Sequence, residues 1–126
     1  MSNRSQYLLV VYIVARRRGE PVSPGDIGEK LDRSPAATTE MLQRLESDGL
    51  VASEPYEGVS LTEEGQTVAA ELYEQYAIFL AFFRDVLEVE DPAQEAMELA
   101  GSVSPLVTDR LVETVLESDR DEITAL

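Results

Sequence analysis

Hydrophobic residues in the first part of the chain recur at helical spacing, in three segments separated by polar turns. The first segment extends from about Asn3 to Arg18, and Gly19 ends it. Its apolar positions repeat every three or four residues. We expect a helix whose inward face consists of Leu8, Leu9, Tyr12, Ile13 and Ala15. The arginines at positions 16–18 either complement the helix dipole or contact a phosphate group.

Each of the next two helical segments begins with a Ser-Pro pair. Serine is a favoured N-cap and proline suits the first helical position, so Ser23 and Ser34 predict two successive helix starts. The turn between them is Asp32-Arg33-Ser34. The expected buried positions are Ile27 and Leu31 in one helix, and Thr38, Met41, Leu42 and Leu45 in the other. Two short helices joined by a tight turn predict a helix-turn-helix, the pattern of a DNA-reading unit.

The polar face of the second of these helices has the residue types of a surface that reads DNA. Two alanines permit close approach to a groove, Thr39 can bond a base edge or a phosphate, and Gln43 can pair with adenine. A carboxylate such as that of Glu40 can accept from a cytosine amino group. An ordinary solvated face is the alternative for any one of these residues. The expected DNA contacts are Ser23, Arg33, Ser34, Ala36, Ala37, Thr39, Glu40, Gln43, Arg44 and Tyr56.

Beyond Gly49 the pattern changes from helical to β-rich. The runs VASE (51–54) and VSLT (59–62) flank the turn sequence PYEG (55–58), which predicts a β-hairpin. A hairpin that follows a reading helix is a wing. Tyr56 at its tip is placed to lie against the sugar-phosphate backbone, although Glu54 and Glu57 beside it oppose this at low salt.

The second half of the chain is helical and rich in apolar residues. A long helix is expected from Thr62 to about Leu87, a shorter one from Asp91 to about Ala100, and a last one from Ser104. The inward positions of the last helix are expected to be Leu106, Val107, Leu111, Val112, Val115 and Leu116. The long helix alone carries more apolar surface than a small winged module can cover, which indicates a protein partner.

The absence of two residue types excludes most catalytic chemistry. The chain has no cysteine and no histidine, which removes disulfides, thiolate nucleophiles, the commonest general base and the commonest transition-metal ligand. Serine/lysine chemistry would rest on Lys30, which is the one lysine and lies in a predicted exposed helix. We therefore expect that the protein is not an enzyme.

Acidic residues dominate the charge. Ten basic residues face 25 acidic ones, for a net charge of −15, and the surplus is spread along the whole chain. This composition is typical of halophile proteins that work in molar salt; an acidic mesophilic protein or a nucleic-acid mimic is the alternative. The Debye length is only about 3 Å at such salt, so the charge does not exclude a DNA partner. Residues 1–66 carry −4 and residues 67–126 carry −11, which places any anion contact in the first half.

The apolar run from Tyr7 to Ala15 is nine residues long, too short to span a bilayer. Its charged flank follows the run and no small-residue cleavage site is seen, which disfavours a signal peptide. We expect a cytoplasmic protein without a membrane partner.

Residues 5–118 resemble the diphtheria-toxin-repressor/manganese-repressor family of transcriptional regulators, in its short two-domain form. The phrases that carry the resemblance are YLLVVYIVARRRGEPVSPGDIGEKLDRSPAATTEMLQRLESDGLV, VSLTEEG, YEQYAIFLAFFRDVLEV and SPLVTDRL. The resemblance implies a mainly α fold: a winged helix-turn-helix domain (1–64), a helical dimerisation domain (65–118) and a frayed tail (119–126). It also implies a homodimer that reads an inverted repeat in double-stranded DNA. The interface is expected to contain Leu72, Tyr76, Phe79, Leu80, Phe83, Leu106 and Leu111.

The resemblance further implies a manganese or iron sensor, and here the sequence departs from the family. The family's ligand positions fall on Tyr7, Val10, Tyr76, Leu80, Met97, Ala100 and Gly101. Manganese and ferrous sites need carboxylates and imidazoles, which these residues do not supply. We expect no metal cofactor. A replacement set built from Glu71, Glu74, Glu95, Glu98 and Met97 is the alternative, as is a small apolar ligand at the former metal position.

Three functions remain open at this stage. The first is a metal-independent, homodimeric regulator that binds a pseudo-palindromic operator through the reading helix and the wing. The second is a regulator that responds to manganese or iron through a non-standard ligand set. The third is a winged-helix module that docks proteins and has lost DNA binding, which Glu40 and the negative first half favour.

Overall fold

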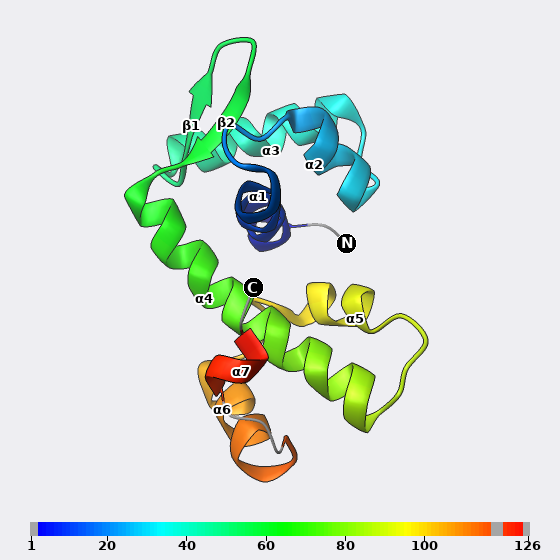
Figure 1. The fold of residues 1–126 in the computed structure, drawn as a ribbon. Coiled ribbons are helices and arrows are strands. Elements are labelled where there is room, and N and C mark those ends of the chain that lie inside the picture. The colour runs from blue at the N-terminus through cyan, green and yellow to red at the C-terminus, as the bar shows by residue number, and fades with distance from the viewer. Residues whose placement is uncertain (1–2, 117–119, 125–126) are drawn as a thin grey trace. The chain divides into compact units, whose positions relative to one another are not determined.

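Three helices and a hairpin follow one another in the N-terminal part of the chain, as the sequence predicts (Figure 1). The computed structural model describes residues 3–116 and 120–124. The chain divides into two compact units, Met1–Ala70 and Glu71–Leu126. The elements are α1 (Arg4–Arg18), α2 (Pro24–Leu31), α3 (Pro35–Ser47), β1 (Val51–Glu54), β2 (Gly58–Leu61), α4 (Glu63–Ala81), the π-helical turn η1 (Phe82–Val86), α5 (Pro92–Leu99), α6 (Pro105–Thr114) and α7 (Arg120–Thr124).

Helix α1 is buried on all sides over its middle. Asn3 caps it through a capping box with Gln6, and Gly19 ends it with a φ of 88°. Every residue from Gln6 to Val14 is buried, so the expected one-sided stripe was too narrow. Ala15, expected inward, is only half-buried. A helix that is apolar on all sides is normally buried in a core. The run of nine apolar residues is the sequence feature that corresponds to this burial.

Helices α2 and α3 start at the two predicted serine caps. The Ser23 hydroxyl accepts from the Gly25 N–H at 3.2 Å, and the Ser34 hydroxyl accepts from the Ala37 N–H at 3.1 Å. Asp32 makes the turn between the helices in a left-handed conformation, with a φ of 54°. Leu31, expected to be buried, is half-buried, whereas Ile27 is fully buried.

The wing is tied to the segment that precedes α2. Strands β1 and β2 pair antiparallel, with Val51 opposite Leu61 and Glu54 opposite Gly58. The β2 strand begins at Gly58, one residue earlier than expected. Val22 pairs with Val59 in an isolated antiparallel β-bridge, through two backbone hydrogen bonds of 2.7 and 3.0 Å. A side chain at Gly58 would run into the Val22 carbonyl, so this close approach requires glycine.

Helix α4 begins where the wing ends. The Thr62 hydroxyl accepts from the Gly65 N–H at 3.0 Å and donates to the Gly49 carbonyl at 2.6 Å. The helix was expected to run as one α-helix to about Leu87. It instead changes at Phe82 into a π-helical turn that ends at Val86.

The second unit leaves much of its apolar surface uncovered. Helix α6 was expected to bury its aliphatic residues, but Leu106 is 60% exposed and Thr108 is the buried residue of that helix. Val107 and Val115 are also exposed, so the expected inward direction is wrong for these three residues. The other expected inward residues, Leu111, Val112 and Leu116, are half-buried. Within the tail that was expected to fray, Arg120–Thr124 is helical. The remainder of that tail, at 119 and 125–126, lies outside the described residues.

Across residues 3–116 and 120–124, no helix is both long enough and apolar enough to cross a membrane.

Two glycines in the first turns of helices provide a matched test of this packing. Replacing glycine by alanine inside a helix normally stabilises it by up to about 1 kcal/mol. At Gly65 the added methyl group would collide with the Leu50 backbone carbonyl, whereas at Gly25 its nearest neighbour is the Ser23 hydroxyl at 3.5 Å. Gly65→Ala should therefore lower the free energy of unfolding by roughly 2 kcal/mol, and Gly25→Ala should leave it unchanged or higher. Urea unfolding in molar salt measures both; equal effects would show that the Leu50–Gly65 approach is not close.

Candidate nucleic-acid interface

The predicted reading face of α3 is exposed on a well-packed helix. Thr38, Leu42 and Leu45 are buried and hold the helix in place. The opposite positions Ala36, Thr39, Glu40, Gln43 and Arg44 are all exposed, and Ala37 is half-buried. Side chains spaced by three and four residues on one face of a rigid helix are the arrangement that major-groove readout requires.

The angle between α2 and α3 depends on a close contact behind this face. A methyl group at Gly28 would lie 2.8 Å from the Thr38 hydroxyl and 3.0 Å from the Arg33 carbonyl. The backbone of α2 at Gly28 therefore packs directly against the Thr38 side chain of α3. Within the described chain the buried Thr38 hydroxyl has no hydrogen-bond partner. A buried hydroxyl without a partner costs roughly 1–3 kcal/mol of stability.

A groove of about 530 Å³ separates α3 from the wing and collects four of the predicted contact residues. Thr39 and Gln43 enter it from α3, Ser23 from the start of α2, and Tyr56 from the tip of the hairpin. The remaining predicted residues do not line this groove. Glu40 and Arg44 line a shallower hollow of about 390 Å³ on the other flank of α3, and Gln43 borders both.

Three carboxylates also line the groove between α3 and the wing. Glu54 and Glu57 were expected near Tyr56, and Glu46 on α3 was not. Glu46 accepts from the Ser53 N–H at 2.9 Å, and Glu54 accepts from the Ser60 hydroxyl at 2.6 Å. The Glu46 carboxylate therefore braces the wing against α3, whereas the Glu54 carboxylate joins the two strands of the wing. The signal that could have identified Glu46 is its place one helical turn after Gln43, on the same face.

The cations of the first unit differ in their availability. Arg4 pairs with Asp48 at 3.0 Å, Arg18 pairs with Asp26 at 3.4 Å, and Arg16 donates to the Tyr12 hydroxyl at 2.9 Å. Two of the three arginines that end α1 thus have local partners. In the parts of the unit that are described, no side-chain partner occurs for Arg17, Lys30, Arg33 and Arg44. Arg33 precedes the first turn of α3 and Arg44 lies on its exposed face, so both are available to phosphates.

Tyr56 lies at the tip of the wing, beside the groove. Its side chain is fully exposed, and its φ of 64° places it at the tightest point of the hairpin turn. The Tyr56 ring is therefore accessible to a molecule that enters the groove between α3 and the wing.

The seven positions that the resemblance assigns to metal ligands do not fit a metal. Tyr7 and Val10 are buried in the first unit, and Ala100 is buried in the second. Gly101 has a φ of 83°, a conformation that favours glycine over any residue with a ligating side chain. Among the described residues, no three carboxylates come together as a cation site. The donor set therefore contains one thioether and two phenols, which are poor ligands for manganese or iron.

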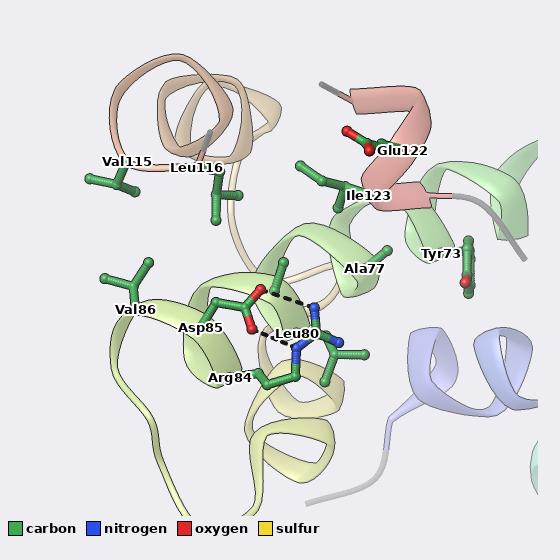
Figure 2. A pocket seen from close by; sticks show the side chains of 11 residues that line it. Tyr73, Ala77, Leu80, Arg84, Asp85, Val86, Val115, Leu116, Glu122 and Ile123 are labelled. Atoms are coloured by element: carbon green, nitrogen blue, oxygen red, sulfur yellow. Dashed lines mark hydrogen bonds and ion pairs between the residues drawn. The ribbon is translucent and has the colours of Figure 1, made fainter. Parts of the chain in front are cut away.

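A cavity of about 680 Å³ lies in the second unit, with α4 and η1 on one side and Val115, Leu116, Glu122 and Ile123 on the other (Figure 2). Leu80 lines it, but Tyr76, Met97, Ala100 and Gly101 do not, so it is not the expected small-ligand site. Arg84 and Asp85 form a bidentate pair at its wall, with N–O distances of 2.8 and 3.0 Å. These hydrogen bonds raise the pKa of the Arg84 guanidinium and lower that of the Asp85 carboxyl. Both side chains are more than half exposed, so the pair contributes little to stability.

The predicted interface residues divide into two groups. Leu72 and Phe79 are buried within the single chain, whereas Tyr76, Leu80, Phe83 and Leu111 are half-buried and Leu106 is exposed. Four further apolar residues that the interface prediction did not name are exposed: Val86, Leu87, Val107 and Val115. The sequence shows that these four residues are apolar, but it does not show that they point away from the core.

Comparisons with known proteins agree with this geometry. Residues 1–59 match the family described as "Iron dependent repressor, N-terminal DNA binding domain". An uncharacterized HTH-type transcriptional regulator of Methanocaldococcus jannaschii is 26% identical over 119 residues, which cover 93% of this chain and 94% of that protein. The HTH-type transcriptional regulator MntR of Lysinibacillus sphaericus is 30% identical over 74 residues, or 59% of this chain and 52% of that protein.

Solved structures show the same fold. The manganese regulator SloR superposes with a TM-score of 0.77 at 30% identity, over 90% of this chain and 53% of its own. A manganese-dependent transcriptional repressor in complex with manganese superposes with a TM-score of 0.79 at 22% identity, over 88% of this chain and 51% of its own. This chain spans about half the length of these two regulators.

Proposed function

We propose that this chain is a transcriptional regulator that binds an inverted-repeat operator as a metal-independent homodimer. The match of residues 1–59 to the DNA-binding domain of the iron-dependent repressors supports the DNA-binding part of this proposal. The observation that carries the proposal is the single groove between α3 and the wing, which brings Thr39, Gln43 and Tyr56 together. Base-reading groups on a helix and an aromatic ring on a wing are what a winged reader needs on one face. A regulator of this kind acts in the cytoplasm.

The uncovered face of the second unit supports the homodimer. The side chains of Val86 in η1 and of Leu87 directly after it are exposed. Leu106 and Val107 on α6, and Val115 directly after it, are exposed as well. Exposed aliphatic residues on neighbouring elements are a common mark of a subunit interface. Two copies joined by a twofold axis present two reading helices, which matches a pseudo-palindromic site.

A regulator that responds to manganese or iron is the second candidate. The names of the related proteins favour it, since SloR is a manganese regulator and another solved relative is a manganese-dependent repressor with bound manganese. Against it stand the inherited ligand positions, which offer neither a carboxylate nor an imidazole. The carboxylates available for a replacement set lie on α4 and α5, at Glu71, Glu74, Glu95 and Glu98.

The direct test of the proposed function is selection of DNA from genomic fragments, followed by mobility shift in molar potassium chloride. We expect enrichment of one inverted repeat that outcompetes random duplex DNA and binds two chains. Failure of every sequence to outcompete random DNA would contradict the proposal. It would favour the protein-docking module, whose groove has the three carboxylates described above.

Individual base contacts are testable with residue-matched controls. Thr39→Ala and Gln43→Ala should each weaken binding to the selected operator by about 1–3 kcal/mol, because each removes a hydrogen bond to a base edge. Thr67 and Gln66 are exposed on α4 and outside the groove. Thr67→Ala and Gln66→Ala should leave operator affinity unchanged, as measured by fluorescence anisotropy. Unchanged affinity and specificity in the two α3 variants would mean that the reading face is wrongly placed.

The salt dependence of binding should be shallow. Arg33 and Arg44 are the available cations nearest α3, and each phosphate that a cation neutralises contributes a log–log slope of roughly −0.9. Glu46, Glu54 and Glu57 lie in the groove that would face DNA, so cation uptake there should offset part of the counterion release. Titrations between 0.5 and about 3 M potassium chloride measure the slope. A slope near the value of about −10 found for a basic repressor would contradict this arrangement.

A further inference from the structure

One side chain in the second unit holds the turn between α5 and α6 against α4. The Gln75 carboxamide oxygen accepts from the Gly101 N–H at 2.9 Å, and its amide nitrogen donates to the Val103 carbonyl at 3.1 Å. Both partners are backbone groups more than 25 residues away in sequence. Only a carboxamide of this length has a donor and an acceptor that can bond both groups at once.

The turn has a backbone that needs such a partner. Helix α5 ends at Leu99, and Gly101 follows with a φ of 83°. The Ser102 N–H bonds back to the Leu99 carbonyl at 2.9 Å, which completes the end of the helix and turns the Gly101 N–H away from it. That donor would otherwise have to rely on solvent. Gln75 therefore satisfies a donor and an acceptor that the turn itself leaves open.

The Gln75 contact lies next to three positions at which the resemblance puts metal ligands. Tyr76 is the neighbour of Gln75 on α4, and Ala100 and Gly101 form the start of the turn. In this chain none of the three side chains suits a metal, and the same two segments are joined by hydrogen bonds instead. We propose that the Gln75 carboxamide replaces a metal ion as the link between α4 and the α5–α6 turn. This inference rests on the proposed function, specifically on its metal independence.

The clamp formed by Gln75, Gly101 and Val103 has a consequence for self-association. Helix α6 begins at Pro105, two residues after the clamped Val103 carbonyl. Leu106 and Val107, in its first turn, are exposed members of the proposed interface. A fixed turn sets the direction in which α6 leaves it, so Gln75 is a positioning residue for this face and does not itself contact the partner.

The experiment compares Gln75→Met with Gln94→Met. Methionine nearly matches glutamine in volume and deletes the hydrogen bonds, which separates bonding from packing. Gln94 is the control because it lies in the same unit and its amide donates to the Glu98 carboxylate at 3.2 Å, away from the turn. Hydrogen exchange of the Gly101 amide and the dimer dissociation constant are measured in molar salt, with thermal unfolding to show that each variant is folded.

In Gln75→Met we expect Gly101 exchange and the dimer dissociation constant each to rise about fivefold or more, the factor for loss of one typical hydrogen bond. Added manganese should restore neither, and Gln94→Met should change neither. If the Gly101 amide of the unaltered protein exchanges as fast as an unprotected amide, the proposed clamp is wrong. This measurement does not depend on whether the variant folds. Exchange or dimerisation unchanged in a folded Gln75→Met would overturn the clamp as well.

The two proposals fail in distinguishable ways. If manganese is required for operator binding by the unaltered protein while Gly101 is protected without metal, metal independence fails and the clamp remains a structural fact. If the protein binds its operator without metal and Gln75→Met has no effect, the proposed function stands and the clamp has no part in it.

Discussion

The antiparallel pairing between Val22 and Val59 holds the wing beside α3, and the groove that we assign to DNA depends on it. The pairing works because Gly58 lets the backbone of β2 approach Val22 more closely than any side chain allows. The same short segment leads directly into Ser23, the cap of α2. One backbone contact therefore fixes the hairpin and the start of the helix-turn-helix together. Glu46, through its bond to the Ser53 N–H, adds a second brace between α3 and the wing.

The charges around this groove restrict how DNA is bound. Several cations of the first unit have local partners, and three carboxylates line the groove itself. Arg33 and Arg44 supply the available positive charge near α3, so attraction to phosphates is weak and is further screened in molar salt. Affinity must then come mainly from base contacts and from the fit of α3 and the wing to the duplex. A net charge of −15 is compatible with this mode of binding, although it is unusual for a DNA-binding protein.

The sequence predicted local structure well and longer-range packing less well. The two Ser-Pro pairs identify helix starts, Gly49 identifies a helix end, and the Pro/Gly turn identifies the hairpin. These residues are reliable signals because they act on the conformation of their own backbone. The complete burial of α1 could not be read from its periodicity, since its polar Gln6 is buried as well. The exposure of Val107 and Val115 was missed because periodicity locates an apolar face without showing whether that face meets the same chain or another one. The clamp was missed for a similar reason: nothing near Gln75 in sequence indicates the backbone of Gly101, which lies 26 residues later.

The central claim is that the regulator binds its operator without a metal because hydrogen bonds take the place of a metal link. The most direct measurement is the equilibrium dissociation constant for the selected duplex in molar potassium chloride, first after exhaustive chelation and then with manganese or ferrous iron added. The account predicts the same dissociation constant in all three conditions. A gain in affinity of about tenfold or more on adding either metal, within the usual range of allosteric coupling, would contradict it.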